Sequence, residues 1–230
     1  MRIIGVMLTE NYKTLNSYNF EFYTYVGNTF TTLAQYEMWE VDEILWLEIK
    51  RTDLPIILEI LEKNRLSTPL TYGGGINTVD DALEFIKTGV ERVAIGSNSH
   101  AKINQILELS SIIGSEATLP IIDVSCIENR LYSRDNILLD ELLLRYNEWS
   151  GEIMIQMIHR DGLIKCANCL DLTLEKIGTY SKLRFILSGS ISVENNLEIK
   201  KFKNIGAIGV AREFNANEAA YAKMKGNYLD

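Results

Sequence analysis

The sequence predicts an α/β protein, a (β/α)8 (TIM) barrel built from two duplicated half-barrels. The first observation is that apolar runs of strand length alternate with amphipathic stretches of helix length along the chain. The second is the length, because 230 residues suffice for eight strand–helix units closed into one barrel. The third is a repeat: Gly74 and Gly189, each after a strand, lie 115 residues apart, and so do Ser97 and Arg212.

The first copy of the repeat extends from residue 69 to residue 97. It predicts a strand over Pro69–Tyr72, three glycines, a helix that begins with a capping box of Thr78 and Asp81, and a strand over Val93–Ile95. Glycines at strand ends let a ligand approach the backbone, and the next helix points free N–H groups at it, as in phosphate sites. Three glycines alone would favour the simpler interpretation, tight turns, because short glycine motifs are weak signals.

A second copy of the same design favours the phosphate interpretation. It consists of a strand over Phe185–Leu187 that ends in small residues, a helix over Val193–Phe202, and a strand over Ala207–Val210 followed by Ala211 and Arg212. Two βαβ units at one spacing indicate an internal repeat.

The remaining elements follow from periodicity and turn residues. Arg2–Leu8 is a continuous apolar run, typical of a strand buried on both faces. The polar and aromatic residues Thr9–Asn28 are expected to form a long mobile loop. Further strands are predicted over Asp42–Ile49, Leu119–Val124 and Glu152–Ile158, and further helices over Thr29–Glu40, Asp53–Asn64, Ile103–Ile113, Leu138–Trp149, Leu170–Tyr180 and Asn217–Met224.

Composition limits the class of protein. With three prolines and no low-complexity tract, residues 1–230 are expected to form one domain. A net charge of −8 and an isoelectric point of about 5.0 disfavour nucleic acid and anionic membranes as partners. Met1 leads directly into a strand and no apolar run approaches about 18 residues, so neither a signal peptide nor a membrane span is expected. Three cysteines without a secretion signal indicate the reducing cytoplasm.

Five stretches of the chain carry a family resemblance: RII near the start, VDEILWLEI, PLTYGGGI, GEIMI followed by HRDG, and SGSIS. With these stretches the chain resembles the cyclase subunit of imidazole glycerol phosphate synthase, the ammonia-using half of a step in histidine biosynthesis. The sister phosphoribosyl-formimino isomerase shares the duplicated barrel, but VDEILWLEI followed by GGGI and RDG favours the cyclase. The resemblance covers nearly the whole chain and implies no cofactor.

The resemblance implies a ligand with two phosphate groups, bound on opposite sides of the barrel at the carboxyl ends of the strands. One phosphate site would consist of Gly74, Gly75, Gly96 and Ser97. The other would consist of Asp161, Gly162, Gly189, Ser190, Ala211 and Arg212.

The resemblance also implies acid–base catalysis by two aspartates, at the ends of the first and fifth strands. The second of these matches Asp123, whereas the first falls on Leu8, which cannot transfer a proton. The lysine of the first loop falls on Asn16, and an aspartate of the second strand is Glu48. Glu48 and Glu10, which lies on the same strand face as Leu8, are the candidates to replace the lost carboxylate.

The family's ammonia gate, by contrast, is complete in this sequence. The family has four charged residues at the opposite, N-terminal mouth of the barrel, where a glutaminase subunit supplies ammonia. Their counterparts, with the same signs of charge, are Arg2, Glu43, Arg92 and Glu152. The simpler alternative is that these charges only stabilise the bottom of the barrel.

This pattern of loss and retention leaves three functions open. One is a lyase-type cyclase in histidine biosynthesis. Another is a catalytically altered paralogue that conducts ammonia and activates a glutaminase for the amidination of a surface sugar; the isomerase is the third and least favoured. Cys126, Cys166, Cys169 and His159 could supply zinc ligands, but a single CxxC pair favours cysteines without a metal.

Overall fold

The structure is a computed structural model. It describes residues 1–18, 20–50, 54–63, 66–158, 167–189, 191–216 and 219–226. No helix in these ranges is both long enough and apolar enough to cross a membrane.

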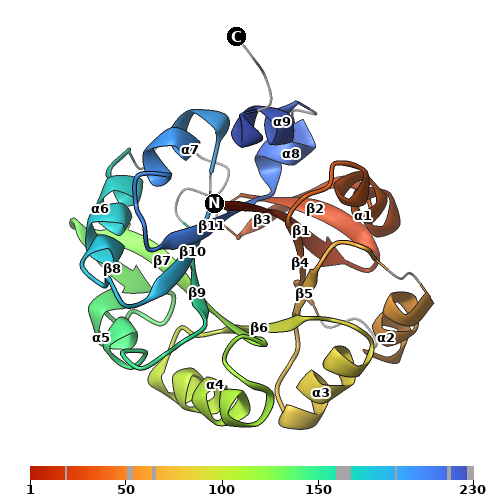
Figure 1. Ribbon diagram of the computed structural model, residues 1–230, viewed down its shortest axis with the longest axis horizontal. Helices are drawn as coiled ribbons and strands as arrows, with labels where there is room; N and C mark the ends of the chain where they lie inside the picture. The colour runs from red at the N-terminus through yellow and green to blue at the C-terminus, as the bar shows by residue number, and fades with distance from the viewer. Residues whose placement is uncertain are drawn as a thin grey trace.

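Eight parallel strands form a closed barrel, and helices surround it (Figure 1). The barrel closes because the last strand pairs with the first, Arg2 opposite Ala207 and Gly5 opposite Val210. In order around the barrel, the strands are β1 (Arg2–Glu10), β4 (Glu43–Glu48), β5 (Leu70–Gly73), β6 (Arg92–Gly96), β7 (Thr118–Ile127), β9 (Glu152–Met157), β10 (Arg184–Ser188) and β11 (Ile205–Val210). The predicted (β/α)8 barrel is confirmed.

The helices lie between successive strands, as predicted, with small differences in their bounds. Thr78 and Asp81 form the expected capping box of α3. The fifth helix ends five residues earlier than expected, and an additional short helix follows β11. The helices are α1 (Thr29–Met38), α2 (Leu54–Lys63), α3 (Val79–Lys87), α4 (His100–Ile113), α5 (Leu139–Leu144), α6 (Ala167–Gly178), α7 (Val193–Ile199), α8 (Arg212–Ala216) and α9 (Ala220–Lys225).

The prediction of a mobile loop over Thr9–Asn28 is wrong. β1 extends to Glu10 and continues as an antiparallel hairpin of β2 (Lys13–Tyr18) and β3 (Phe22–Asn28). Asn11 and Tyr12 both have positive φ, as the two central residues of a tight type I′ turn require. The aromatic and β-branched residues that were interpreted as loop residues are those that strands favour.

The fifth barrel strand ends in a similar hairpin. β7 extends to Ile127 and pairs with β8 (Arg130–Ser133). Its two turn residues, Glu128 and Asn129, also have positive φ. Each half of the barrel thus has a hairpin at the end of its first strand. Each half also has a glycine with positive φ at the repeated position, Gly74 in the first half and Gly189 in the second. Their origin by duplication stays a prediction.

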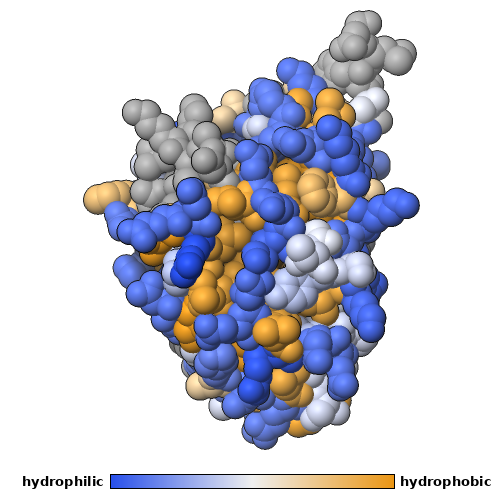
Figure 2. Space-filling view, turned by 90° about the vertical axis from the view of Figure 1, so that its left-hand side faces the viewer, coloured by the Kyte–Doolittle hydropathy of each residue, from blue (hydrophilic) through white to orange (hydrophobic). Residues whose placement is uncertain are grey.

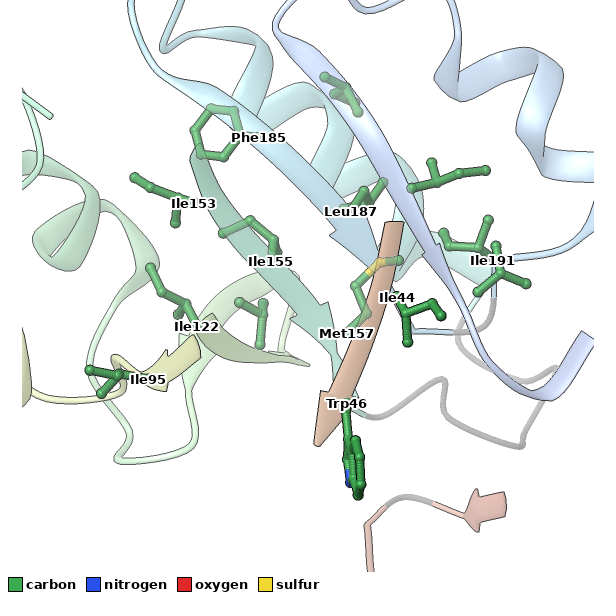
Figure 3. Packing of buried hydrophobic residues seen from close by; sticks show 14 of the residues in the cluster. Ile44, Trp46, Ile95, Ile122, Ile153, Ile155, Met157, Phe185, Leu187 and Ile191 are labelled. Atoms are coloured by element: carbon green, nitrogen blue, oxygen red, sulfur yellow. The ribbon is translucent and has the colours of Figure 1, made fainter. Parts of the chain in front are cut away.

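The hydrophobic core has two layers because successive residues of a strand point to opposite faces. The larger layer lies between the barrel and the helices; it includes Ile44, Trp46, Ile153, Ile155 and Phe185 (Figure 3). The smaller layer fills the lumen of the barrel and contains Ile4, Val6, Leu45, Ala94, Leu119, Ile121, Met154, Ile186 and Ala207.

Polar side chains cover most of the side of the molecule that carries α5, α6 and α7, with hydrophobic side chains between them (Figure 2). The exposed apolar residues of this side include Leu144 on α5 and Leu197 on α7, which are 63% and 70% exposed.

Gly74→Ala tests whether the backbone at the end of β5 needs glycine. Gly74 has a φ of 127°, and an added Cβ would lie 2.5 Å from the Glu48 carbonyl oxygen. We expect the free energy of unfolding to fall by about 2–3 kcal/mol. The matched control is Gly114→Ala, where φ is also positive but no atom lies within 4 Å of the added Cβ; it should lose only about 1 kcal/mol. Urea unfolding measures both, and equal losses would show that the contact with Glu48 contributes nothing.

Candidate functional site

Inward-facing residues divide the barrel interior into three levels. β1 shows the pattern: Arg2 lies at the N-terminal end, Ile4 and Val6 belong to the lumen layer, and alternation directs Leu8 to the C-terminal end. β9 repeats it with Glu152, Met154 and Gln156. We call the C-terminal end of the barrel the mouth.

At the N-terminal end, the four charged residues Arg2, Glu43, Arg92 and Glu152 form a closed ring of ion pairs, the charge quartet. Arg2 Nη2 lies 2.5 Å from Glu152 Oε2 and 3.9 Å from Glu43 Oε2. Arg92 Nη1 lies 2.9 Å from Glu152 Oε2, and its Nη2 pairs with Glu43 Oε1. Each cation therefore contacts both anions.

Burial and a neighbouring hydroxyl hold the charge quartet in place. The side chains of Glu43, Glu152 and Arg92 are only 8%, 6% and 13% exposed. Thr71 donates to Glu43 Oε1 at 2.5 Å and accepts from Arg92 Nε at 3.1 Å. Burial alone would lower the pKa of Arg2, but the hydrogen bond and charge of Glu152 outweigh it and raise the pKa. Two positively charged and two negatively charged side chains are thus paired within one ring.

Asp123 on β7 lies at the mouth, with its side chain 17% exposed. Its Oδ2 accepts from Asn98 Nδ2 at 3.1 Å and from Arg134 Nε at 3.1 Å. Burial raises the pKa of Asp123, while the charge of Arg134 and the hydrogen bond from Asn98 lower it; the net direction is upward. The Arg134 guanidinium also lies 5.7 Å from the centre of the Phe20 ring, at the tip of the β2–β3 hairpin.

Leu8 lies on β1, which is four strands from β7 in either direction around the barrel. It pairs with Leu47 on β4 and with Leu15 on β2, and it is 6% exposed. The mouth thus has a carboxylate on β7 and an apolar side chain on the opposite strand.

Neither Glu10 nor Glu48, the two candidates to replace the carboxylate lost at Leu8, is available at the mouth. Glu10 pairs with Lys50 at 2.7 Å. Glu48 is on the outer face of the barrel, where it accepts from Thr9 Oγ1 at 2.5 Å; Thr9 in turn accepts from Trp46 Nε1 at 2.6 Å. Asn16, at the position of the family's lysine, accepts a hydrogen bond from Asn215 at 2.7 Å.

The first expected phosphate site has glycines whose backbone could accommodate a ligand, but the hydroxyl of its serine, Ser97, contacts another residue of the protein. Gly74 and Gly75 have positive φ at the end of β5, and Gly96 ends β6. Ser97 is fully buried: its N–H donates to Ile121 O at 2.6 Å and its hydroxyl lies 2.5 Å from Tyr146 Oη. In this conformation Ser97 contacts the protein rather than an open site.

The second expected phosphate site is only partly described, because Asp161, Gly162 and Ser190 lie outside the described residues. Gly189 has a φ of 93° and Ala211 packs against the lumen layer. The Arg212 guanidinium lies 4.7 Å from the centre of the Tyr18 ring.

The described residues contain no cluster of three or more possible metal ligands. Cys126 is half-buried near the end of β7, and Cys169 is buried on α6. Cys166 and His159 lie outside the described residues.

Sequence reasoning missed three polar residues at the mouth: Asn98, Arg134 and Gln156. Arg134 follows Asp123 by eleven positions in a stretch of mixed charge, and no local pattern marks it as a partner. Gln156 could have been found, because it follows Glu152 by four positions on a strand and alternation gives both the same face.

The protein is thus a closed (β/α)8 barrel with polar groups at the mouth and a charged ring at the bottom, and in such barrels ligands meet the carboxyl ends of the strands. A family model described as "Histidine biosynthesis protein" matches residues 6–219. The chain belongs to this family.

Three relatives make the comparison more specific. The chain is 29% identical to "Putative imidazole glycerol phosphate synthase subunit hisF2" of Campylobacter jejuni, covering 83% of this chain and 80% of that protein. It is 28% identical to "Imidazole glycerol phosphate synthase subunit HisF" of Petrotoga mobilis, covering 90% and 85%. It is 26% identical to the subunit of the same name in Alkaliphilus metalliredigens, covering 97% and 94%. The chain is thus similar to the cyclase-type subunit, as the sequence motifs indicated.

Arg92→Met tests the charge quartet as a buried ion cluster. Removing Arg92 leaves two buried glutamates with one half-exposed arginine, so the free energy of unfolding should fall by about 3–5 kcal/mol. Arg184→Met is the matched control: its pair with Glu116 is 52% and 70% exposed, and the loss should stay below about 1 kcal/mol. Denaturant unfolding at neutral pH measures both losses. Similar values for the two variants would contradict a buried cluster.

Proposed function

We propose that this chain is a divergent cyclase-type subunit that takes ammonia from a glutaminase at its N-terminal face and passes it through the barrel to the mouth. The observation that carries the proposal is the pairing of a complete charge quartet with an incomplete acid–base pair. On this proposal the chain has kept the ammonia-handling end of the barrel and has altered the chemical end.

The geometry of the charge quartet supports an ammonia entrance. A ring in which each cation contacts two anions has alternative pairings, so one arginine can shift without leaving a buried charge alone. Above the ring, the lumen residues are apolar. An apolar passage favours neutral ammonia over ammonium, because an unpaired ion costs far more to desolvate than a neutral molecule.

The geometry of the mouth supports a changed reaction. General acid–base catalysis needs a titratable group within hydrogen-bond reach on each side of the reacting atoms. Asp123 is available on β7, but Leu8 occupies the opposite strand, Glu10 pairs with Lys50, and Glu48 faces outward. The acceptor of the ammonia would then be bound by a further enzyme, such as one that amidinates a surface sugar.

The second candidate is the ordinary cyclase of histidine biosynthesis. One observation favours it: Asp123 remains at the mouth, and burial raises its pKa, as suits a proton-transfer group. A movement of Glu10 away from Lys50 would have to supply the second group.

A phosphorylated ligand is part of both candidates, and Arg212 is the cation at the second phosphate site. Arg212 begins α8 directly after β11, and a guanidinium can bind a phosphate through two parallel N–H groups. Arg212→Ala should therefore weaken the binding of a sugar bisphosphate by about 1–3 kcal/mol, measured by calorimetry. The control is Arg184→Ala, at the bottom of the barrel. An unchanged affinity in Arg212→Ala would show that Arg212 does not bind the phosphate.

Turnover with and without a restored carboxylate distinguishes the two candidates. Given free ammonia and the histidine-pathway substrate, the wild-type protein should turn over at least about a thousandfold slower than a cyclase with both aspartates, because one proton-transfer group contributes about 10²–10⁴. Leu8→Asp should recover part of the rate. The wild-type chain should still bind a glutaminase and raise its activity. Ordinary turnover of about 1 s⁻¹ or more would contradict the altered-paralogue proposal and return the chain to histidine synthesis.

A further inference from the structure

The side chain of Asn98 is bonded to Asp123 at two points. Its Nδ2 donates to Asp123 Oδ2 at 3.1 Å, and its Oδ1 accepts from the Asp123 backbone N–H at 2.8 Å. The two ends of the amide cannot be exchanged, because a backbone N–H can only donate and therefore requires the amide oxygen. The Ser133 hydroxyl in turn donates to the Asn98 carbonyl oxygen at 2.9 Å. Contacts at two points fix the orientation of the Asp123 carboxylate relative to its own backbone.

Arg134, which directly follows β8, approaches the same carboxylate oxygen. Its backbone N–H donates to the Asp123 carbonyl oxygen at 3.0 Å, and its Nε lies 3.1 Å from Asp123 Oδ2. The Phe20 ring, with its centre 5.7 Å from the guanidinium, packs against Arg134. Oδ2 thus accepts from two donors, one of them charged, while no donor to Oδ1 is found in the described part of the chain. Hydrogen bonds and a positive charge at Oδ2 favour the ionised carboxylate and leave Oδ1 to meet a ligand.

We propose that Asn98 and Arg134 are positioning residues that orient the Asp123 carboxylate and keep it ionised, so that Asp123 accepts a proton from a bound ligand through Oδ1. The proton passes from the ligand to Oδ1, and the negative charge passes from the carboxylate to the ligand. This inference rests on the proposed function and deepens it, because it assigns a direction of proton transfer to the remaining half of the acid–base pair. Neither Asn98 nor Arg134 is among the site residues that the sequence motifs implied.

Opposing influences set the pKa of Asp123. Burial is the largest and raises the pKa, whereas the charge of Arg134 and the hydrogen bond from Asn98 lower it. The charge of Asp135 raises it, and the register neighbour on β9, Gln156, is neutral. Without Arg134 and Asn98, nothing in the described part of the chain would oppose the effect of burial. The carboxyl would then hold its own proton up to a higher pH, and a protonated carboxyl cannot accept another.

Asn98 also joins Asp123 to the first expected phosphate site. It directly follows Ser97 and lies two residues after Gly96, the last residue of β6. Its two hydrogen bonds span from the end of β6 to β7. A phosphate bound at the end of β6 is therefore held at a fixed distance from the carboxylate. Such positioning matters for rate, because a misplacement of about 1 Å can cost about a hundredfold.

NMR of the isolated chain, with no glutaminase or acceptor present, measures the pKa and the χ1 rotamer of Asp123. Arg134→Gln should raise the pKa, because it removes a positive charge from Oδ2. Asn98→Asp should also raise it, because this variant keeps an oxygen for the Asp123 N–H but places a second carboxylate beside Oδ2. Asn98→Ala should replace one χ1 rotamer by an average of several. The matched controls are Arg184→Gln and Asn104→Asp, both at exposed side chains, and they should change neither quantity.

Each role has its own contradicting result. An unchanged pKa of Asp123 in Arg134→Gln would overturn the role of Arg134. An unchanged pKa in Asn98→Asp together with an unchanged rotamer in Asn98→Ala would overturn the role of Asn98. Because the Arg134 side chain is half-exposed, Arg134→Gln tests the proposal even if an Asn98 variant fails to fold.

Catalysis supplies a second readout in Leu8→Asp, the variant in which the proposed function expects part of the cyclisation to return. Adding Arg134→Gln should move the acid limb of the pH–rate profile to higher pH and lower kcat about ten- to a hundredfold, with KM changed by less than about twofold. An acid limb that does not move would overturn the proposal; where Leu8→Asp recovers no rate, the NMR titration decides. If the chain fails to activate a glutaminase but the NMR changes occur, the proposed function fails and the positioning roles stand.

Discussion

The closure of eight parallel strands into a barrel is the constraint on which every other feature depends. Closure gives each strand one inward face, and the period of two then places every second residue in the lumen. β9 shows the consequence: Glu152, Met154 and Gln156 lie at the bottom, in the lumen and at the mouth. A change of register by one residue would move all three to the helix-covered face. The charge quartet, the apolar lumen and the mouth are therefore positioned by one geometry.

The two ends of the barrel are under different physical constraints. At the bottom, each charged residue contacts two opposite charges and three of the four are buried, so the loss of any one leaves a buried charge without sufficient compensation. The four residues can only persist or disappear together. At the mouth, Leu8 packs against apolar neighbours on β4 and β2 and leaves no charge unpaired. An aspartate at this position can therefore be lost without a cost in folding, and only a reaction that uses it would retain it.

The sequence predicted the barrel well because its signals are local. Glycine at strand ends, the capping box of Thr78 and Asp81, and apolar runs each depend on a few neighbouring residues. The β2–β3 hairpin was missed because aromatic and polar residues on a half-exposed hairpin lack the apolar run of a buried strand. Arg134 was missed for a different reason: its contacts with Asp123 and Phe20 join three separate segments, and no spacing in the sequence encodes them.

The two sides of the mouth carry different kinds of side chain, and this difference limits the chemistry that the mouth can support. Around β1 and β4, Leu8 and Leu47 give an apolar wall; around β7 and β9, Asp123 and Gln156 give adjacent acceptors. A reaction that moves protons on both faces of a substrate needs titratable groups on both walls. The described residues supply such a group, Asp123, on one wall and an apolar side chain, Leu8, on the other, so on the proposed function a second proton-transfer group would have to come from elsewhere.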